Sequence, residues 1–181
     1  SDKPRIVWEE KNFEVWSVNA KHRGPCIAFA LKEKDKTKVN TEYTKKFGLV
    51  KHKLLGELQK GKDVVYKGKI IKAEKATFIK KGKKLVYITD SSYRKEFEEL
   101  AKECDLLICE ATYSSNEEKQ AEERGHMTAK KAGRLAKRSK AKKLVITHFS
   151  TKYKTKKELL SEAKKEFENT VAAHDFLELE V

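Results

Sequence analysis

Three polar residues follow apolar runs in the second half of the sequence: Asp90 after "KLVYIT", Glu110 after "DLLIC" and His148 after "KLVIT". Apolar runs of this length, separated by segments with helical spacing, are typical of strands in a sheet covered by helices. In such sheets functional side chains gather just beyond the carboxyl ends of the strands. One polar residue there is usually a cap or a turn former. Three at consecutive strands are expected to meet at one edge, which indicates a site.

Carboxylates and imidazoles together suit a borderline divalent ion such as Zn²⁺. His126 lies between Gly125 and the helix-like segment "MTAKKAGRLAKR", where the helix dipole disfavours a cation unless an anion is close. Glu110 is the candidate anion, and a Glu–His pair beside a metal can give a proton to a leaving group. The alternative is a histidine that only caps the helix or lies at the surface. His22, which stands between a strand-like run and a Gly-Pro turn, is uninformative by itself.

The elements that would hold these residues form an α/β pattern. Strands are predicted at "IVWE", "NFEVWSVNA", "PCIAFAL", "KLVYITD", "DLLICEA" and "KLVITH", and helices at "YRKEFEELAKEC", "MTAKKAGRLAKRSKA" and "TKKELLSEAKKEF". The chain closes in extended form with "TVAAHDFLELEV". Strands that alternate with helices predict a sheet that helices cover on at least one face.

Residues 32–63 differ from the rest, because they are highly charged and carry only small apolar clusters at helical spacing. This composition predicts an excursion from the sheet, made of two short helices closed by Gly61. The segment "DVVYKGKIIKA" that follows is predicted to be a hairpin with its turn near Lys67–Gly68.

The charge balance favours a polyanionic partner. The chain has 42 Lys and Arg against 28 Asp and Glu, a net charge of +14, which exceeds what solubility requires and attracts RNA. A generally lysine-rich proteome, as in a heat-adapted organism, is an alternative explanation of this charge, and it is compatible with RNA binding. No apolar run approaches the roughly 20 residues that span a bilayer, and nothing resembles a signal peptide, so no membrane association is expected. The spacing of Cys26, Cys104 and Cys109 fits no disulfide or zinc-finger framework, which favours a cytoplasmic location.

The motifs around these residues resemble those of ribonuclease Z, the metallo-β-lactamase-fold endonuclease that matures the 3′ ends of tRNA. "YITDSSY" is similar to that family's strand-end aspartate motif, "DLLICEATY" to its HEAT motif, "GHMTA" to its HST motif and "VITHFSTKY" to its final histidine motif. "VWSVNAKHRGPCIAFALKEK" resembles the strand with a metal-binding histidine, "FGLVKHKLLGELQKGKDV" the flexible arm that grips tRNA, and "NTVAAHDFLELEV" the C-terminal strand. The resemblance spans nearly the whole chain.

The resemblance implies an α/β fold that is the second half of an αββα metallo-β-lactamase sandwich with a protruding basic arm. Residues 1–181 would form a single partial domain, and residues 32–63 the inserted tRNA-binding arm. His22 would bind one zinc ion and His148 the other, with Asp90 bridging them, and His126, supported by Glu110, would protonate the departing 3′ oxygen. Phosphate contacts are expected as a group from Lys45, Lys46, Lys51, Lys53, Lys60 and Lys62, although any one of them can equally be a solvated surface lysine.

The family's HxHxDH motif, which supplies most of its zinc ligands, has no counterpart in the sequence. The five histidines are His22, His52, His126, His148 and His174, and no two lie closer than 22 residues apart. A catalytic zinc ion generally takes three protein ligands and an open position. His22, Asp90 and His148 would be divided between two ions, so the chain alone is not expected to be a competent hydrolase.

Three interpretations of this absence are open: a split enzyme completed by a second chain with HxHxDH, a fragment of a longer protein, or a non-catalytic RNA-binding or assembly subunit. We favour the split enzyme, a zinc-dependent endoribonuclease for precursor tRNA whose two ions are shared with the partner half, in a dimer of such pairs. A pure RNA grip has no need of the polar residues at the strand ends. Half a sandwich also leaves an apolar sheet face that a partner would cover.

The sequence departs from the family pattern at four places. Thr89 stands where the family has Gly before the aspartate, Cys109 replaces the histidine of HEAT, and Met127 replaces the serine of HST. Thr89 leaves the backbone less free than a glycine would, and Met127 removes a possible hydrogen-bond acceptor at the helix start. The arm has "KHK" where Gly-Pro is usual, which bears on its tRNA contacts. Another hydrolase of the same fold is a less favoured alternative, because "GHMTA", "THFSTKY" and the arm are ribonuclease Z features.

Overall fold

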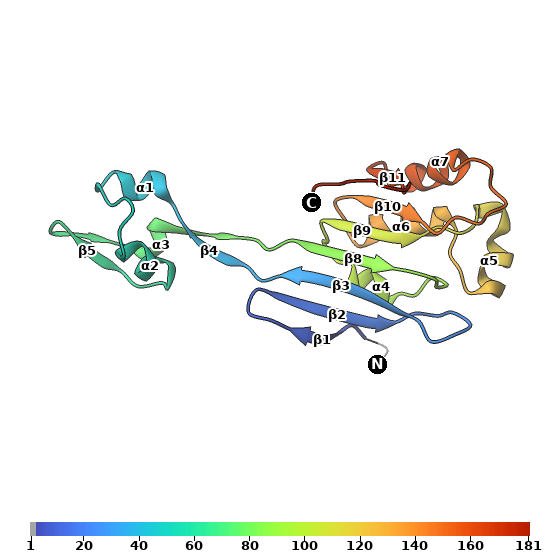
Figure 1. Ribbon diagram of the computed structural model, residues 1–181, viewed down its shortest axis with the longest axis horizontal. Coiled ribbons are helices and arrows are strands. Elements are labelled where there is room, and N and C mark those ends of the chain that lie inside the picture. The colour runs from blue at the N-terminus through green and yellow to red at the C-terminus, as the bar shows by residue number, and fades with distance from the viewer. Residues whose placement is uncertain (1–2) are drawn as a thin grey trace. The chain divides into compact units, whose positions relative to one another are not determined.

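The central element is a seven-stranded mixed sheet with the strand order β1-β2-β3-β8-β9-β10-β11 (Figure 1). The structure, a computed structural model, describes residues 3–181. The strands of this sheet are β1 (Arg5–Glu9), β2 (Phe13–Asn19), β3 (Ile27–Glu33), β8 (Lys84–Ile88), β9 (Leu106–Glu110), β10 (Leu144–Thr147) and β11 (Thr170–Ala172). The pairs from β1 to β8 are antiparallel, whereas those from β8 to β11 are parallel.

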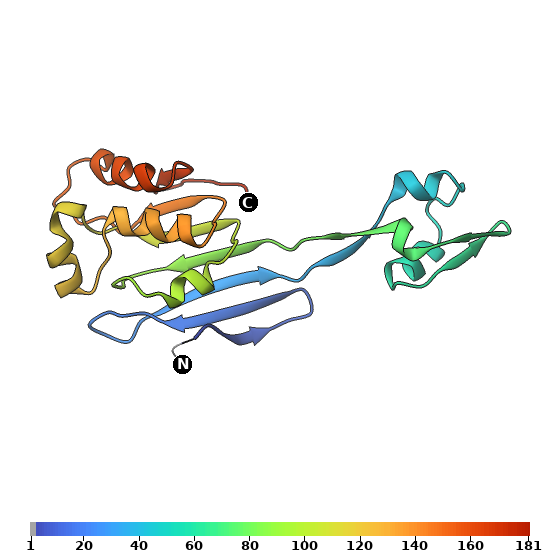
Figure 2. The same ribbon diagram turned by 180° about the vertical axis from the view of Figure 1, so that it is seen from behind.

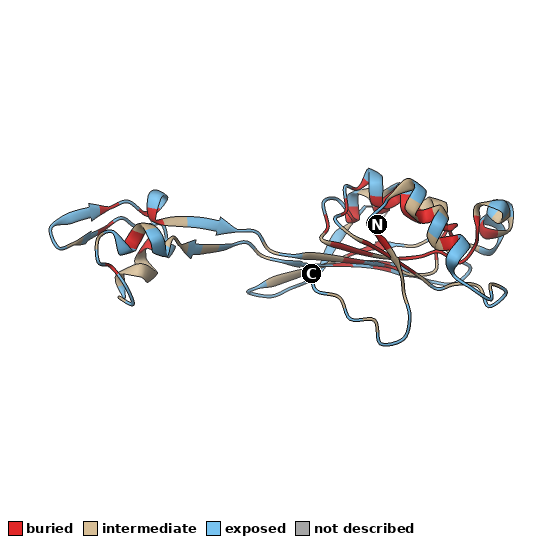
Figure 3. Ribbon diagram, turned by 90° about the horizontal axis from the view of Figure 1, so that it is seen from above, coloured by how far each residue is buried: buried red, intermediate tan, exposed pale blue. Residues whose placement is uncertain are grey.

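The helices of this part of the chain pack on one face of the sheet (Figures 2 and 3). They are α4 (Glu96–Leu100), α6 (Ala129–Arg138) and α7 (Lys157–Glu166), and two short elements precede α6, η1 (Ser115–Glu117) and α5 (Glu118–Arg124). In α6 the buried residues recur at helical spacing, among them Ala132, Leu135 and Ala136. They pack on the face that also carries Leu107 and Ile146, which belong to the same core cluster. The alternation of the strands therefore places one set of side chains under the helices.

The opposite face of the sheet is apolar and exposed. Phe29 pairs with Tyr87 and Leu31 with Leu85 across β3 and β8. Phe29 and Tyr87 remain 39% and 41% exposed, and Ile27 and Leu31 are similar. A contiguous apolar surface of this kind is unusual for a monomer.

Residues 34–82 form a second compact unit, which we call the basic unit, whereas the residues up to Glu33 and from Lys83 onward form the sheet unit. The elements of the basic unit are β4 (Lys36–Val39), α1 (Thr41–Lys45), α2 (Leu54–Gln59), β5 (Val64–Tyr66), β6 (Lys69–Ile71), α3 (Ala73–Ala76) and β7 (Thr77–Lys80). It has its own core, which contains Leu49, Leu58, Val64, Ile71, Ala73 and Ala76.

The two short helices and the hairpin predicted here are confirmed. Lys67 and Gly68 have φ of +51° and +74°, as expected for a tight turn between β5 and β6. The unit extends beyond the predicted limit at residue 63, because β4 and β7 pair with each other from its two ends.

Several predicted elements are shorter in the structure than their sequence patterns. The helix expected over 93–104 is reduced to α4, and Glu103 with φ of +53° ends the turn that follows it. The helix expected over 127–141 begins only after Thr128, whose side chain caps it by accepting from the Lys131 N–H. The extended C-terminal segment forms a strand only over β11. Over the part of the chain that the structure describes, no helix is long and apolar enough to cross a membrane.

Gly133 sets how closely α6 and α7 approach each other. A Cβ at this position would lie 2.6 Å from the carbonyl oxygen of Ala163 and 3.0 Å from the Cβ of Glu166. We expect Gly133→Ala to force the helices apart and to lower the free energy of unfolding by about 1–3 kcal/mol. The measurement is urea unfolding followed by the fluorescence of Trp16, which packs against the sheet-unit core.

Gly24→Ala is the control, because a Cβ there meets no atom within 4 Å. It is expected to change the free energy of unfolding by less than about 0.5 kcal/mol. A Gly133→Ala variant as stable as this control would contradict the packing described for α6 and α7.

Candidate active site

The loops that follow β8, β9 and β10 bring the predicted site residues to one edge of the sheet. The strands are parallel, so their carboxyl ends lie together, and they place Asp90, Glu110 and His148 there. The Nε2 atom of His148 is 3.3 Å from Asp90 Oδ1. The ring of His126 stacks on that of His148 at a centroid distance of 5.3 Å and lies 4.9 Å from that of His22. All five predicted residues therefore lie in one cluster, in two groups that share His126.

Glu110 is fully buried and binds the surrounding loops together. Its Oε1 accepts hydrogen bonds from the Ser91 N–H at 2.7 Å and from His126 Nδ1 at 3.0 Å. Its Oε2 accepts from the Thr112 hydroxyl at 2.6 Å, the Met127 N–H at 3.1 Å and the Thr112 N–H at 3.3 Å. Five donors on two oxygens leave no lone pair free, so the carboxylate acts as a structural acceptor rather than as an open ligand.

His126 lies in the turn between α5 and α6, two residues before the cap Thr128, so it precedes the helix as the sequence predicts. Gly125, with φ of +78°, ends α5, and the His126 N–H then donates to the Ala121 carbonyl at 2.8 Å. The position of the His126 ring therefore depends on its hydrogen bond to Glu110 more than on the dipole of α6.

His22 is held by backbone bonds that tie the loop after β2 to the loop after β8. The Lys21 N–H donates to the Ser91 hydroxyl at 2.8 Å, and the Ser92 N–H donates to the Lys21 carbonyl at 2.9 Å. The His22 ring contacts the Gly125 carbonyl oxygen through Nδ1 at 3.0 Å. A metal-ligand candidate from the N-terminal part of the chain is thus fixed next to His126.

His148 has a left-handed backbone, with φ of +57°, which is uncommon for a residue other than glycine. Its side chain is 45% exposed, and Nδ1 lies 2.9 Å from the Thr112 hydroxyl. A strained backbone that persists at a cluster of polar groups is a recurrent feature of functional sites.

Among residues 3–181, two groups could hold a metal ion: His22, Asp90 and His126, and Glu110, His126 and His148, with ligand atoms within 4.8 Å of one another in each. The oxygens of Glu110 are occupied by donors, so the group around Asp90 is the better candidate. The second group brings in His148, which also lies beside Asp90. Imidazole and carboxylate donors in this number fit a borderline divalent ion.

The charge of Asp90 also suits a metal ligand. Burial alone would raise its pKa, but the hydrogen bond from the Thr89 hydroxyl and the nearby His148 and His126 outweigh burial and lower the pKa below its ordinary value. Asp90 is therefore ionised at neutral pH. Thr89, a departure from the family pattern, thus contributes a hydrogen bond to the side chain that follows it.

The six predicted RNA-binding lysines are exposed on the basic unit. Lys45 pairs with Glu42, and Lys60 and Lys62 pair with Glu57. Residues 34–82 contain 15 lysines and five acidic residues, so ten of the fourteen net positive charges of the chain lie in this unit.

Sequence reasoning missed Ser91, Thr112 and Gly125, which hold the site residues. Thr112 is part of the segment "CEAT", and Gly125 directly precedes His126, so proximity to the motifs was the only available signal. The contacts that each of them makes come from loops distant in the sequence.

Comparison with known proteins shows which proteins this chain resembles. The β-lactamase superfamily domain matches residues 74–149. Ribonuclease Z of Nitrosopumilus maritimus is 35% identical over 181 residues, which cover 99% of this chain and 60% of that protein. Ribonuclease Z of Archaeoglobus fulgidus is 38% identical over 173 residues, covering 93% of this chain and 56% of that protein. The chain thus spans little more than half the length of these curated relatives.

Solved structures agree on the fold. The metallo-β-lactamase fold protein YhfI from Bacillus subtilis has a TM-score of 0.59 at 22% identity, over 94% of this chain and 49% of that chain. Human tRNase Z, short form, has a TM-score of 0.57 at 22% identity, over 97% of this chain and 46% of that chain. The predicted α/β class with a metallo-β-lactamase fold, and the resemblance to ribonuclease Z, are confirmed.

The hydrogen bonds of Glu110 predict a large effect of Glu110→Gln on stability. The amide nitrogen of glutamine cannot accept, so at least two of the five donors lose their partner. Each unsatisfied buried donor costs roughly 1–3 kcal/mol, and we expect the free energy of unfolding to fall accordingly in urea titrations.

Glu118→Gln is the matched control, because Glu118 is an exposed glutamate paired with Lys131. Its expected effect on the free energy of unfolding is within about 0.5 kcal/mol. If Glu110→Gln unfolded at the same urea concentration as Glu118→Gln, the buried carboxylate would not hold the loops together.

Proposed function

We propose that this chain, a metallo-β-lactamase-fold relative of ribonuclease Z, is one half of a zinc-dependent endoribonuclease that processes the 3′ ends of precursor tRNA. The observation that carries the proposal is the convergence of His22, Asp90 and His148 around the Glu110–His126 pair. The relatives that match over almost the whole chain are ribonuclease Z proteins, which supports this substrate class.

His22, Asp90 and His148 are the residues that would hold zinc. When bound, zinc would act as a Lewis acid, which lowers the pKa of a bound water towards neutral and polarises the phosphodiester. Asp90 is ionised and lies 3.3 Å from the Nε2 atom of His148, so the two can bind the same ion. The His22 ring lies 4.9 Å from that of His126, and His22 would be a ligand of the second ion.

His126 is the residue that would protonate the departing 3′ oxygen. Its Nδ1 is engaged by Glu110, so Nε2 is the atom that can hold or release a proton towards the substrate. Glu110 keeps the ring in one orientation, and a positioned acid of this kind typically contributes about 10²–10⁴-fold in rate.

The remaining zinc ligands would come from a second chain that carries HxHxDH. Catalytic zinc generally takes three protein ligands, and His22, Asp90 and His148 are too few for two ions. The exposed face of Ile27, Phe29, Leu31 and Tyr87 is a surface that such a partner would cover. We place the two ions at the junction, shared with the partner half, in a dimer of such pairs.

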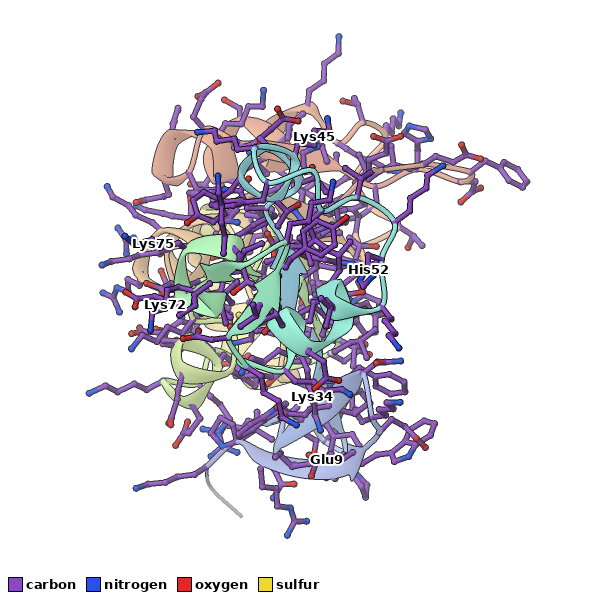
Figure 4. The ribbon with its side chains drawn as sticks, turned by 90° about the vertical axis from the view of Figure 1, so that its left-hand side faces the viewer. Glu9, Lys34, Lys45, His52, Lys72 and Lys75 are labelled. Carbon is purple, nitrogen blue, oxygen red and sulfur yellow. The ribbon has the colours of Figure 1, made fainter. Side chains whose placement is uncertain are left out.

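The basic unit would bind the tRNA. Its ten net positive charges can neutralise several phosphates, and Lys45, Lys72 and Lys75 lie at its surface (Figure 4). The ion pairs that Lys45, Lys60 and Lys62 form are exposed and therefore weak, so they do not prevent these lysines from contacting phosphates.

The proposal predicts a division of labour between the two units. Asp90→Ala and His148→Ala should abolish cleavage of precursor tRNA by the assembled enzyme and leave tRNA binding in gel shifts almost unchanged. Deletion of residues 34–82 should weaken tRNA binding, reduce its salt dependence and spare cleavage of a small phosphodiester. The Glu33 N–H donates to the Lys83 carbonyl at 2.8 Å, so a short turn can join the two ends.

Each class of variant is the control for the other, since both retain a core of the same sheet unit. Strong loss of tRNA binding in Asp90→Ala or His148→Ala would count against this division. Unchanged cleavage in them would favour the alternative, a catalytically silent RNA-binding subunit.

His126→Ala separates proton donation from metal binding. The assembled enzyme should keep its zinc, measured by elemental analysis, while cleavage falls by about 10²–10⁴-fold because the leaving oxygen loses its acid. His174→Ala, at an exposed histidine outside the site, is expected to change neither quantity. Loss of zinc in His126→Ala would instead make His126 a ligand, a role that its position beside His22 and Asp90 also allows.

A further inference from the structure

The three histidines of the site share one hydrogen-bonding arrangement. In each of them Nδ1 faces a fixed oxygen: the Gly125 carbonyl for His22 at 3.0 Å, Glu110 Oε1 for His126 at 3.0 Å, and the Thr112 hydroxyl for His148 at 2.9 Å. A neutral imidazole carries its proton on one nitrogen only, and the partner of the other nitrogen decides which.

The Thr112 hydroxyl determines the tautomer of His148. A hydroxyl has one proton to donate, and the Thr112 oxygen lies between Glu110 Oε2 at 2.6 Å and His148 Nδ1 at 2.9 Å. The carboxylate can only accept, and the distance to it is the shorter one, so the Thr112 proton points at Glu110. The hydroxyl oxygen then accepts from His148, which places the proton of that ring on Nδ1.

The Gly125 carbonyl has the same effect on His22, because a carbonyl can only accept and His22 must therefore donate from Nδ1. The approach needs a glycine at position 125. Its φ is +78°, and an added Cβ would lie 3.0 Å from His22 Nδ1 and 3.1 Å from His22 Cα. A side chain at this position would displace the ring that its carbonyl holds.

We propose that Thr112 and Gly125 are positioning residues that fix His148 and His22 in the Nδ1-protonated tautomer, so that both rings present an unprotonated Nε2 to the site before any metal ion binds. This inference deepens the proposed function and rests on it for its purpose. Asp90 Oδ1, 3.3 Å from His148 Nε2, is an acceptor that competes with Thr112 for the ring proton, so the tautomer of the metal-free wild type is the decisive observation. Through Thr112 the carboxylate of Glu110 acts on His148 as well as on His126.

The benefit of this arrangement is preorganisation. When the ion binds, a ring that already has the right tautomer and orientation needs no free energy to change either. Removing an outer hydrogen-bond partner of a metal-binding histidine typically costs 10–100-fold in metal affinity, roughly the effect expected for Thr112 and Gly125 variants.

The test uses the whole chain labelled with ¹⁵N-histidine, and reads each tautomer from long-range ¹H–¹⁵N spectra at about pH 8, where an ordinary histidine is neutral. We expect Nδ1-protonated His22 and His148 in the wild type without metal. Thr112→Val keeps the shape but lacks the hydroxyl, so His148 should become a mixture of tautomers. The affinity of the same sample for Zn²⁺ alone should fall by about 10–100-fold. Thr112→Ser, which keeps the hydroxyl, should retain both the Nδ1-protonated tautomer of His148 and the wild-type affinity for Zn²⁺.

The Gly125→Ala variant should give a mixture of tautomers at His22 and leave His148 unchanged, and it should also weaken Zn²⁺ binding. Its control is Gly61→Ala, where φ is +81° but no atom lies within 4 Å of an added Cβ, so the backbone cost is the same without a displaced ring. If Gly125→Ala fails to fold, the Thr112 pair still decides the matter.

Two results would overturn the proposal: a wild-type His148 protonated at Nε2, or Thr112→Val spectra identical to those of Thr112→Ser. Neither readout requires RNA cleavage. An assembly that never cleaves tRNA would refute the proposed function but would not affect the assignment of the tautomers. An active enzyme with the wrong tautomers would refute only this inference.

Discussion

The site depends on one buried carboxylate. Glu110 is at the end of a central strand with no exposed surface, and a buried charge of this kind is tolerated only when donors surround it. Its five donors come from the loops after β8 and β9 and from the turn between α5 and α6, so satisfying it brings those loops together. The loop with His22 is then tied to Ser91, and His148 is tied to Thr112. The same interaction that stabilises the fold therefore assembles the candidate site.

Much of this could be predicted from the sequence, because the edge of a parallel sheet is determined by apolar runs that end in polar residues. The proximity of Asp90, Glu110 and His148 follows from that pattern alone. Other features could not be predicted. The paired residues of β4 and β7 lie 38 to 44 positions apart in the sequence, and the short polar run "KTKV" of β4 gives no sign of its partner. The roles of Thr112 and Gly125 depend on contacts between loops, and residue type does not reveal such contacts.

The chain separates tasks that make opposite demands on structure. The sheet unit holds a strained His148 backbone and a saturated buried carboxylate, both of which need a rigid surrounding core. The basic unit has a small core of its own and most of the net charge, which attracts polyanions. The exposed apolar face of β3 and β8 is a third surface. It lowers the stability of the isolated chain unless a partner covers it.

The central claim is that this chain carries half of a metal site that a second chain completes. The most direct measurement is native mass spectrometry of the protein isolated from its own cells, with metal content read from the same sample. The account predicts a tightly bound second chain that contains HxHxDH, with roughly two zinc ions per pair. A metal-free species without such a partner would contradict it and would leave a silent RNA-binding subunit.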